Sequence, residues 1–223
     1  MGLTGIFLIL FLVVHVGINA CIWANDEGQM FNLAAHFMGS KVVIRILEVG
    51  LFLFIFIHII QGLALEISNR SKRGVGYAVN YGNRGSKWYS RSMGLLGTLI
   101  LLFLVLHWIH FWIPSRITGV TGPNGEDLKQ TYGTVTVHDM YHLMYITFEQ
   151  LWVVVIYVLG CISLGYHLAH GFQSAFRSLG VHNKKYNKML TSTGYAFSII
   201  VSLAFAMMPI SIYLKWLSPN ANW

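Results

Sequence analysis

Four histidines lie deep inside long apolar segments of this 223-residue chain. Each of four runs carries one of them: His15 in FLVVHVGIN, His58 in LFLFIFIHIIQGLAL, His107 in LLFLVLHWIHFW and His167 in LGCISLGYHLAHG. An ionisable side chain within a bilayer costs free energy unless it is paired, bound to a metal or faces a cavity. We therefore expect four helices, each with one deep histidine, to form two bis-histidine metal sites. For any single histidine, the alternative is a hydrogen-bonded contact between helices.

The composition indicates an all-α membrane protein. Hydrophobic residues make up 55% of the chain, charged residues only 10%, and the mean hydropathy is +0.58. A soluble domain usually has about a quarter charged residues. Here the charges cluster between apolar runs, which is typical of a bundle of transmembrane helices. We predict a single membrane domain over 1–223 with five spans, at about 3–23, 42–67, 92–114, 148–172 and 190–217.

Several functions are excluded by missing motifs. The two cysteines, Cys21 and Cys161, are too few for a four-cysteine iron–sulfur cluster. The C-x-x-C-H motif is absent, so any haem would be held non-covalently. No G-x-G-x-x-G or Walker sequence supports nucleotide binding. The net charge of +7 comes from basic residues in loops, which topology and anionic lipid explain better than nucleic acid does.

The basic residues also predict the orientation of the bundle. The loop 172–190 carries four of them and no acid, and the loop 66–91 carries six. Because cytoplasmic loops are enriched in Lys and Arg, both loops should be cytoplasmic, with the N-terminus inside and the C-terminus outside. We therefore expect a multi-pass membrane protein with this orientation. The six residues are Arg70, Lys72, Arg73, Arg84, Lys87 and Arg91.

The depths of the histidines predict how they pair. His58, His107 and His167 each lie about 22–24 Å along their helix, at 1.5 Å per residue, which is past the midplane. The first and third helices run outward, so His15 and His107 fall in the outer half. The second and fourth run inward, so His58 and His167 fall in the inner half. The two pairs should be separated by roughly 10–15 Å along the membrane normal, which suits two stacked haems.

The residues one turn from the histidines fit this interpretation. Gly62 and Gly171 each follow a histidine by four positions, which would let a flat macrocycle lie close to the backbone. Asn19, Gln61 and Ser163 are polar groups that could support a ligand or a haem propionate. His110 and His170 lie nearer the helix ends, where we expect interfacial or propionate contacts.

With these residues placed, the sequence resembles the cytochrome b membrane-anchor subunit of succinate dehydrogenase/fumarate reductase (complex II), of the five-helix, dihaem type. The resemblance covers about residues 4–176. It is carried, in order, by TGIFLILFLVVHV, FNLAAHFMGS with RILEVGLFLFIFIHIIQG, MGLLGTLILLFLVLHWIHFW and GYHLAHGFQSAF.

The resemblance implies axial ligation of two haem b groups, the distal one by His15 and His107 and the proximal one by His58 and His167. It also implies a flavoprotein and an iron–sulfur partner on the inner face, and electron transfer to or from a quinone, menaquinone. Succinate chemistry would belong to a partner, so this chain would be an electron-transfer subunit. One departure from some relatives is Gly165, where a glutamate would serve a transmembrane proton path.

A quinone or proton site is expected near Glu48, with His36 just before the same helix. A carboxylate within a span is unfavourable unless it is paired. The alternative is that Glu48 pairs with Arg45 at the interface.

Three other functions remain open from the sequence. The chain could be the quinone-reactive cytochrome b of another dehydrogenase or a hydrogenase. It could be a transporter whose histidines carry metal ions or protons, although transporters usually show paired acidic residues within the membrane. A structural anchor without haem would leave four deep imidazoles unexplained.

Overall fold

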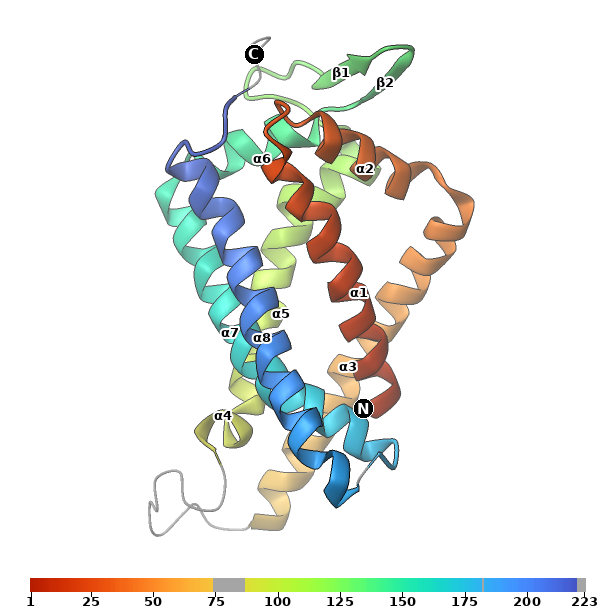
Figure 1. Ribbon diagram of the computed structural model, residues 1–223, viewed down its shortest axis with the longest axis vertical. Helices are drawn as coiled ribbons and strands as arrows, with labels where there is room; N and C mark the ends of the chain where they lie inside the picture. Colours follow the sequence, from red (N-terminus) through yellow and green to blue (C-terminus); the bar gives the residue numbers. More distant parts are fainter. Residues whose placement is uncertain (74–86, 182, 220–223) are drawn as a thin grey trace.

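Five long apolar helices form the body of the molecule (Figure 1). The computed structural model describes residues 1–73, 87–181 and 183–219, so Arg84 and His182 lie outside the described residues. The helices are α1 (Gly2–Ala20), α3 (Val42–Arg73), α5 (Met93–His107), α7 (Leu151–Ser178) and α8 (Lys184–Tyr213). With the turns that extend them, five segments are long and apolar enough to cross a membrane: Gly2–Ala24, Val42–Lys72, Met93–Thr118, Leu151–Ser178 and Lys185–Tyr213. The prediction of an all-α fold with five helices that could cross a membrane is confirmed.

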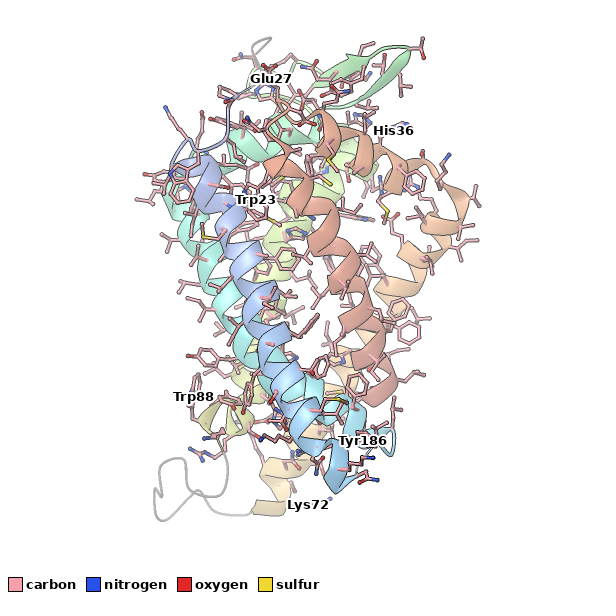
Figure 2. The ribbon with its side chains drawn as sticks, in the orientation of Figure 1. Trp23, Glu27, His36, Lys72, Trp88 and Tyr186 are labelled. Atoms are coloured by element: carbon pink, nitrogen blue, oxygen red, sulfur yellow. The ribbon has the colours of Figure 1, made fainter. Side chains whose placement is uncertain are left out.

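The two ends of the bundle differ in structure (Figure 1). The hairpin end carries α2 (Gln29–Ser40), the strands β1 (Lys129–Tyr132) and β2 (Val135–His138), α6 (Met140–Phe148) and the C-terminal segment. The opposite end, called the α4 end below, carries α4 (Trp88–Arg91) and the N-terminus. Figure 2 shows Glu27 and His36 at the hairpin end, and Lys72, Trp88 and Tyr186 at the α4 end.

The third span does not end at Pro114, as the sequence had suggested. It continues through two π-helical segments, η2 (Trp108–Trp112) and η3 (Pro114–Thr118). Proline lacks an N–H group and clashes with the carbonyl four residues earlier in an α-helix, and the wider π turn gives the ring more room beside that carbonyl. Pro209 lies inside the continuous helix α8.

Two helix starts also differ from the predicted spans. Phe148 belongs to α6, so α7 begins at Leu151. The helix α8 begins at Lys184 rather than near 190, because the Asn183 side chain accepts a hydrogen bond from the backbone N–H of Lys185 at 2.9 Å. An N-cap of this kind satisfies one of the unpaired N–H groups of the first turn.

The connections at the hairpin end are ordered, although we predicted residues 24–41 and 115–147 to be loops. The first contains α2, and the second contains the antiparallel hairpin β1–β2 and α6. His142 lies on α6. Gly133, with a φ of +63°, supplies the left-handed conformation that a tight hairpin turn requires.

One buried side chain joins these connections. Asn32 on α2 donates hydrogen bonds to Asp139 Oδ1 at 2.9 Å and to the Tyr132 hydroxyl at 3.0 Å. Its carbonyl oxygen accepts the backbone N–H of Tyr141 at 2.9 Å. Asn32 and Asp139 are both buried. A residue on α2 thus fixes the hairpin and the start of α6 over one end of the bundle.

The packing of the spans leaves two diagonal helix pairs apart. The helix α1 contacts α3, α7 and α8, and α5 contacts α3 and α7. Within the described residues, neither α1 with α5 nor α3 with α7 forms an extended backbone contact. Side chains that face each other across these two diagonals therefore span the interior of the bundle.

Candidate functional site

The four deep histidines lie in two pairs across the two diagonals. The ring centroids of His15 on α1 and His107 on α5 are 5.8 Å apart, with an angle of 86° between the rings. Those of His58 on α3 and His167 on α7 are 6.2 Å apart, with an angle of 65°. The structure therefore brings together the same residues that the depth arithmetic paired. Their role as metal ligands stays a prediction.

The two pairs lie at different heights in the bundle. Thr4, near the start of α1, contacts His58, whereas His15 lies about three turns further along the same helix, roughly 16 Å of rise. Because α1 runs from the α4 end toward the hairpin end (Figure 1), the His58–His167 pair is nearer the α4 end. The His15–His107 pair is nearer the hairpin end.

Aromatic rings surround the hairpin-end pair. Phe11 stacks on His15 with centroids 5.1 Å apart, and Phe205 lies 5.4 Å from the same ring. Phe103 stacks on His107 at 5.8 Å, and Phe111 lies at 5.5 Å. These side chains exclude water from both imidazoles, which favours their neutral form, the form that binds metals.

Asn19 is the polar neighbour of this pair. Its Nδ2 atom donates to the backbone carbonyl of His15 at 2.8 Å and lies 3.4 Å from His15 Nδ1. His107 Nδ1 is buried and has no hydrogen-bond partner among the described residues.

One hydroxyl group and one amide group lie beside the α4-end pair. The Thr4 hydroxyl lies 3.2 Å from His58 Nδ1 and 3.3 Å from the side-chain oxygen of Gln61, one turn further on α3. His167 Nδ1 is buried without a partner in the described part of the chain. A Cβ atom added at Gly97 or Gly171 would meet the His167 ring at 3.9 or 4.0 Å, so both glycines keep the space beside that ring open.

The geometry and chemistry of the pairs fit a haem better than a bare metal ion. Two imidazoles that bind one iron from opposite sides, at about 2 Å each, have ring centroids about 6 Å apart. No group of three or more His, Cys, Asp or Glu that could hold a metal ion occurs among the described residues. Two protein ligands suffice for a metal that arrives with four donor nitrogens of its own macrocycle.

His110 bonds a residue that the sequence analysis did not single out. Its Nδ1 atom lies 2.9 Å from the Tyr157 hydroxyl, and the two rings are stacked with an angle of 12°. Tyr157 is buried and also packs against Phe103 and Phe148. A tyrosine in an apolar helix is usually interpreted as a core residue. Only the fold shows that Tyr157 contacts His110, a histidine one turn from His107.

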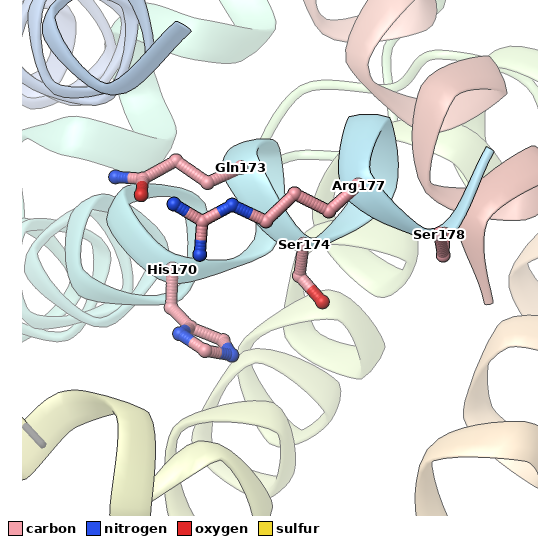
Figure 3. Close-up of a pocket in the computed structure, with 5 residues that line it drawn as sticks. All are labelled: His170, Gln173, Ser174, Arg177 and Ser178. Carbon is pink, nitrogen blue, oxygen red and sulfur yellow. The ribbon is translucent and has the colours of Figure 1, made fainter. Parts of the chain in front are cut away.

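A polar pocket lies one turn beyond His167, at the α4 end (Figure 3). It has a volume of about 340 Å³, and His170, Gln173, Ser174, Arg177 and Ser178 line it from successive turns of α7. Its cationic and hydroxyl groups suit a carboxylate, in keeping with the expected propionate contact of His170. Arg70, near the end of α3, pairs with Glu66 at 2.6 Å.

Glu48 is held by three partners at the hairpin end. It accepts hydrogen bonds from Trp112 Nε1 at 2.6 Å and Arg116 Nε at 3.1 Å, and its second oxygen lies 3.4 Å from Arg45. The ion pair with Arg45 is the alternative that the sequence left open, and Arg116 extends it to the third span. His36 is exposed on α2, and no hydrogen bond or ion pair joins it to Glu48 among the described residues. A quinone or proton role for Glu48 and His36 stays a prediction.

Comparison with protein-family models, with curated proteins and with solved structures found no match to this chain. The site geometry therefore carries the functional conclusion.

Proposed function

We propose that this protein is the dihaem cytochrome b subunit that anchors a succinate:quinone oxidoreductase in the bacterial inner membrane. In this role it transfers electrons between an iron–sulfur subunit and a membrane quinone, menaquinone. The observation that carries the proposal is the arrangement of four histidines as two facing pairs at two heights, each across a diagonal of the bundle.

Each pair would hold the iron of one haem b, His15 with His107 and His58 with His167. The bound haem would supply one-electron oxidation and reduction. The chain's own residues keep the imidazoles neutral and dry, through Phe11, Phe103, Phe111 and Phe205 around the hairpin-end pair. They also keep the helix backbones apart where a flat group would lie.

The charge distribution supports an assembly on the α4 end. Lys87, Lys185 and Lys188 lie at this end together with Arg70, Arg91 and Arg177. Positive charge favours the cytoplasmic side. A flavoprotein and an iron–sulfur protein would bind there, near the His58–His167 pair, and the acceptor quinone would react near the other pair. Succinate oxidation or fumarate reduction would occur in the flavoprotein partner, as the resemblance to this family implies.

Haem quantitation on the purified protein tests this proposal. Two b-type haems per chain by pyridine haemochrome, with a dithionite-reduced difference spectrum, are the expected result. Absence of haem from a folded preparation would contradict it and favour a transporter. Co-purification of a flavoprotein and an iron–sulfur protein, rather than a hydrogenase or formate dehydrogenase, distinguishes the proposed complex from related dihaem cytochromes.

A further inference from the structure

We propose that Thr4 is a positioning residue for the α4-end haem: its hydroxyl oxygen accepts the Nδ1 proton of His58 and lowers the midpoint potential of that haem. This inference rests on the proposed function. It concerns a residue that looks unremarkable in the sequence, a single threonine in an apolar helix.

The contacts of the Thr4 hydroxyl favour one direction for its bond to His58. Its Oγ1 atom lies 3.0 Å from the backbone carbonyl of Met1 and 3.3 Å from the amide oxygen of Gln61. Both are acceptors, and the carbonyl contact is the common bond of a helical threonine to the preceding turn. A hydroxyl has one proton and two lone pairs. With its proton directed to a carbonyl, Oγ1 meets His58 Nδ1 at 3.2 Å as an acceptor.

This direction fixes the tautomer of His58. In a neutral imidazole one nitrogen carries the proton and the other offers a lone pair. A proton on Nδ1 leaves Nε2 as the metal-binding atom. An acceptor on the distal N–H also makes the ring a stronger donor to the metal. Stronger donation stabilises the oxidised iron more than the reduced iron, so the hydroxyl should lower the midpoint potential.

The fold holds Thr4 in place from the opposite side of α1. A Cβ atom at Gly5 would come within 3.3 Å of the Ala175 Cβ, and one at Gly2 would collide with Ser178. These two glycines let the start of α1 lie close against α7. Thr4 is itself buried and bonds residues of α3, the helix that carries His58. Its hydroxyl is therefore fixed between the two helices that supply the α4-end pair.

The other three histidines lack such a contact in the described structure. The Nδ1 atoms of His107 and His167 have no partner there, and that of His15 meets the Asn19 amide nitrogen at 3.4 Å. An amide N–H is a donor, so it cannot accept a proton from the ring. The effect of the Thr4 hydroxyl should therefore be confined to one of the two haems.

Three variants test this inference. Thr4→Val removes the hydroxyl at nearly constant shape, and Thr4→Ser retains it. Thr98→Val is the matched control, because the Thr98 hydroxyl also bonds a carbonyl of its own helix, that of Gly94 at 2.9 Å, but lies on an exposed face. The readouts are haem content, a potentiometric titration of each spectral component, and the electron paramagnetic resonance g values of the ferric haems.

We expect Thr4→Val to retain two haems, with the midpoint potential of the His58-dependent component shifted to a more positive value and its g values changed. The other component should be unchanged. Thr4→Ser should resemble the wild type, and Thr98→Val should change neither component.

Two results would overturn the inference while leaving the proposed function standing. One is a Thr4→Val protein with two haems at unchanged potentials. The other is loss of the same haem from both Thr4→Val and Thr4→Ser, which would make the residue a packing element. Loss of this haem from Thr4→Val but not from Thr4→Ser would support a requirement for the hydroxyl group. A wild-type protein without haem would instead refute the proposed function and this inference with it.

Discussion

His58 and His167 face each other with ring centroids 6.2 Å apart, although α3 and α7 form no extended backbone contact in the described residues. The two rings therefore extend into the space between the backbones of α3 and α7. A pair of ligands that lies across a diagonal is suited to a large planar group, because neighbouring helices can enclose its edges.

Substitution of single histidines should separate the two sites. His58→Ala and His167→Ala should each remove the same spectral component, and His15→Ala and His107→Ala the other, because an iron that loses one axial ligand is no longer held on both sides. Haem content and difference spectra measure this. His36→Ala, at an exposed position, is the control and should retain both components. Depletion of one and the same component by His58→Ala and His107→Ala would show that the pairing is wrong.

Glu48 should stabilise the contact between the second and third spans. Glu48→Gln removes the charge that pairs with Arg116, and truncation of one partner of a charge-assisted hydrogen bond typically costs about 1.5–3 kcal/mol. We expect a lower midpoint of thermal unfolding in detergent. Arg45→Gln is the control, since the Arg45 side chain is 51% exposed and its contact is 3.4 Å long. Exposed pairs of this kind contribute about 0–1 kcal/mol. An equal effect of both substitutions would contradict the central role of Arg116.

Asn32 should determine whether the hairpin end is ordered. Asn32→Leu leaves the Asp139 carboxylate and the Tyr141 N–H with one hydrogen bond fewer. Loss of a hydrogen bond typically costs about 0.5–1.5 kcal/mol, and about 1.5–3 kcal/mol where one partner is charged. We expect faster amide hydrogen exchange over α2, the hairpin and the start of α6, with the spans protected as before. Thr131→Ala, which removes an exposed hydroxyl contact to Thr136 in the same hairpin, should have little effect. Unchanged exchange in the Asn32 variant would mean that apolar packing alone holds this region.

Alkaline pH should loosen the hairpin end through Tyr141. Burial raises the pKa of this phenol to about 12, from about 10 in an unfolded chain. The unfolded state loses its proton first, so the contribution of Tyr141 is fully present below pH 10 and is lost as the pH rises toward 12. Thermal unfolding followed from pH 9 to 12 should show this loss.

The matched variant is Tyr141→Phe. It should be about 1 kcal/mol less stable at neutral pH, because it lacks the 3.0 Å bond from the hydroxyl to the Ser218 carbonyl. It should also show a weaker decline between pH 10 and 12. An equal loss of thermal stability in the wild type and in Tyr141→Phe between pH 10 and 12 would show that other groups cause it.

The spans and the histidine pairs could be predicted because each rests on a strong local signal. A run of apolar residues long enough to cross a bilayer is visible in any sequence, and helix rise converts position into depth. The pairing of His15 with His107 followed from these two quantities together with the alternating direction of the helices.

The hairpin end and Thr4 could not be predicted in the same way. The elements α2, β1, β2 and α6 are short, and they depend on tertiary bonds such as those of Asn32 rather than on a periodic apolar pattern. The contact of Thr4 with His58 requires knowing which face of α1 meets α3. The third-span partner of Glu48 was hidden for the same reason, whereas Arg45 is its neighbour on one helix.

The order of the pairs along the chain has a consequence for biosynthesis. Both members of the hairpin-end pair are present once α5 has been made, whereas His58 must wait for His167 on α7, on the far side of the hairpin and α6. Chains grow at about 5–20 residues per second, so the second site is complete some seconds after the first. The two proposed haem sites would therefore be completed one after the other during synthesis, and the site nearer the α4 end would be completed last.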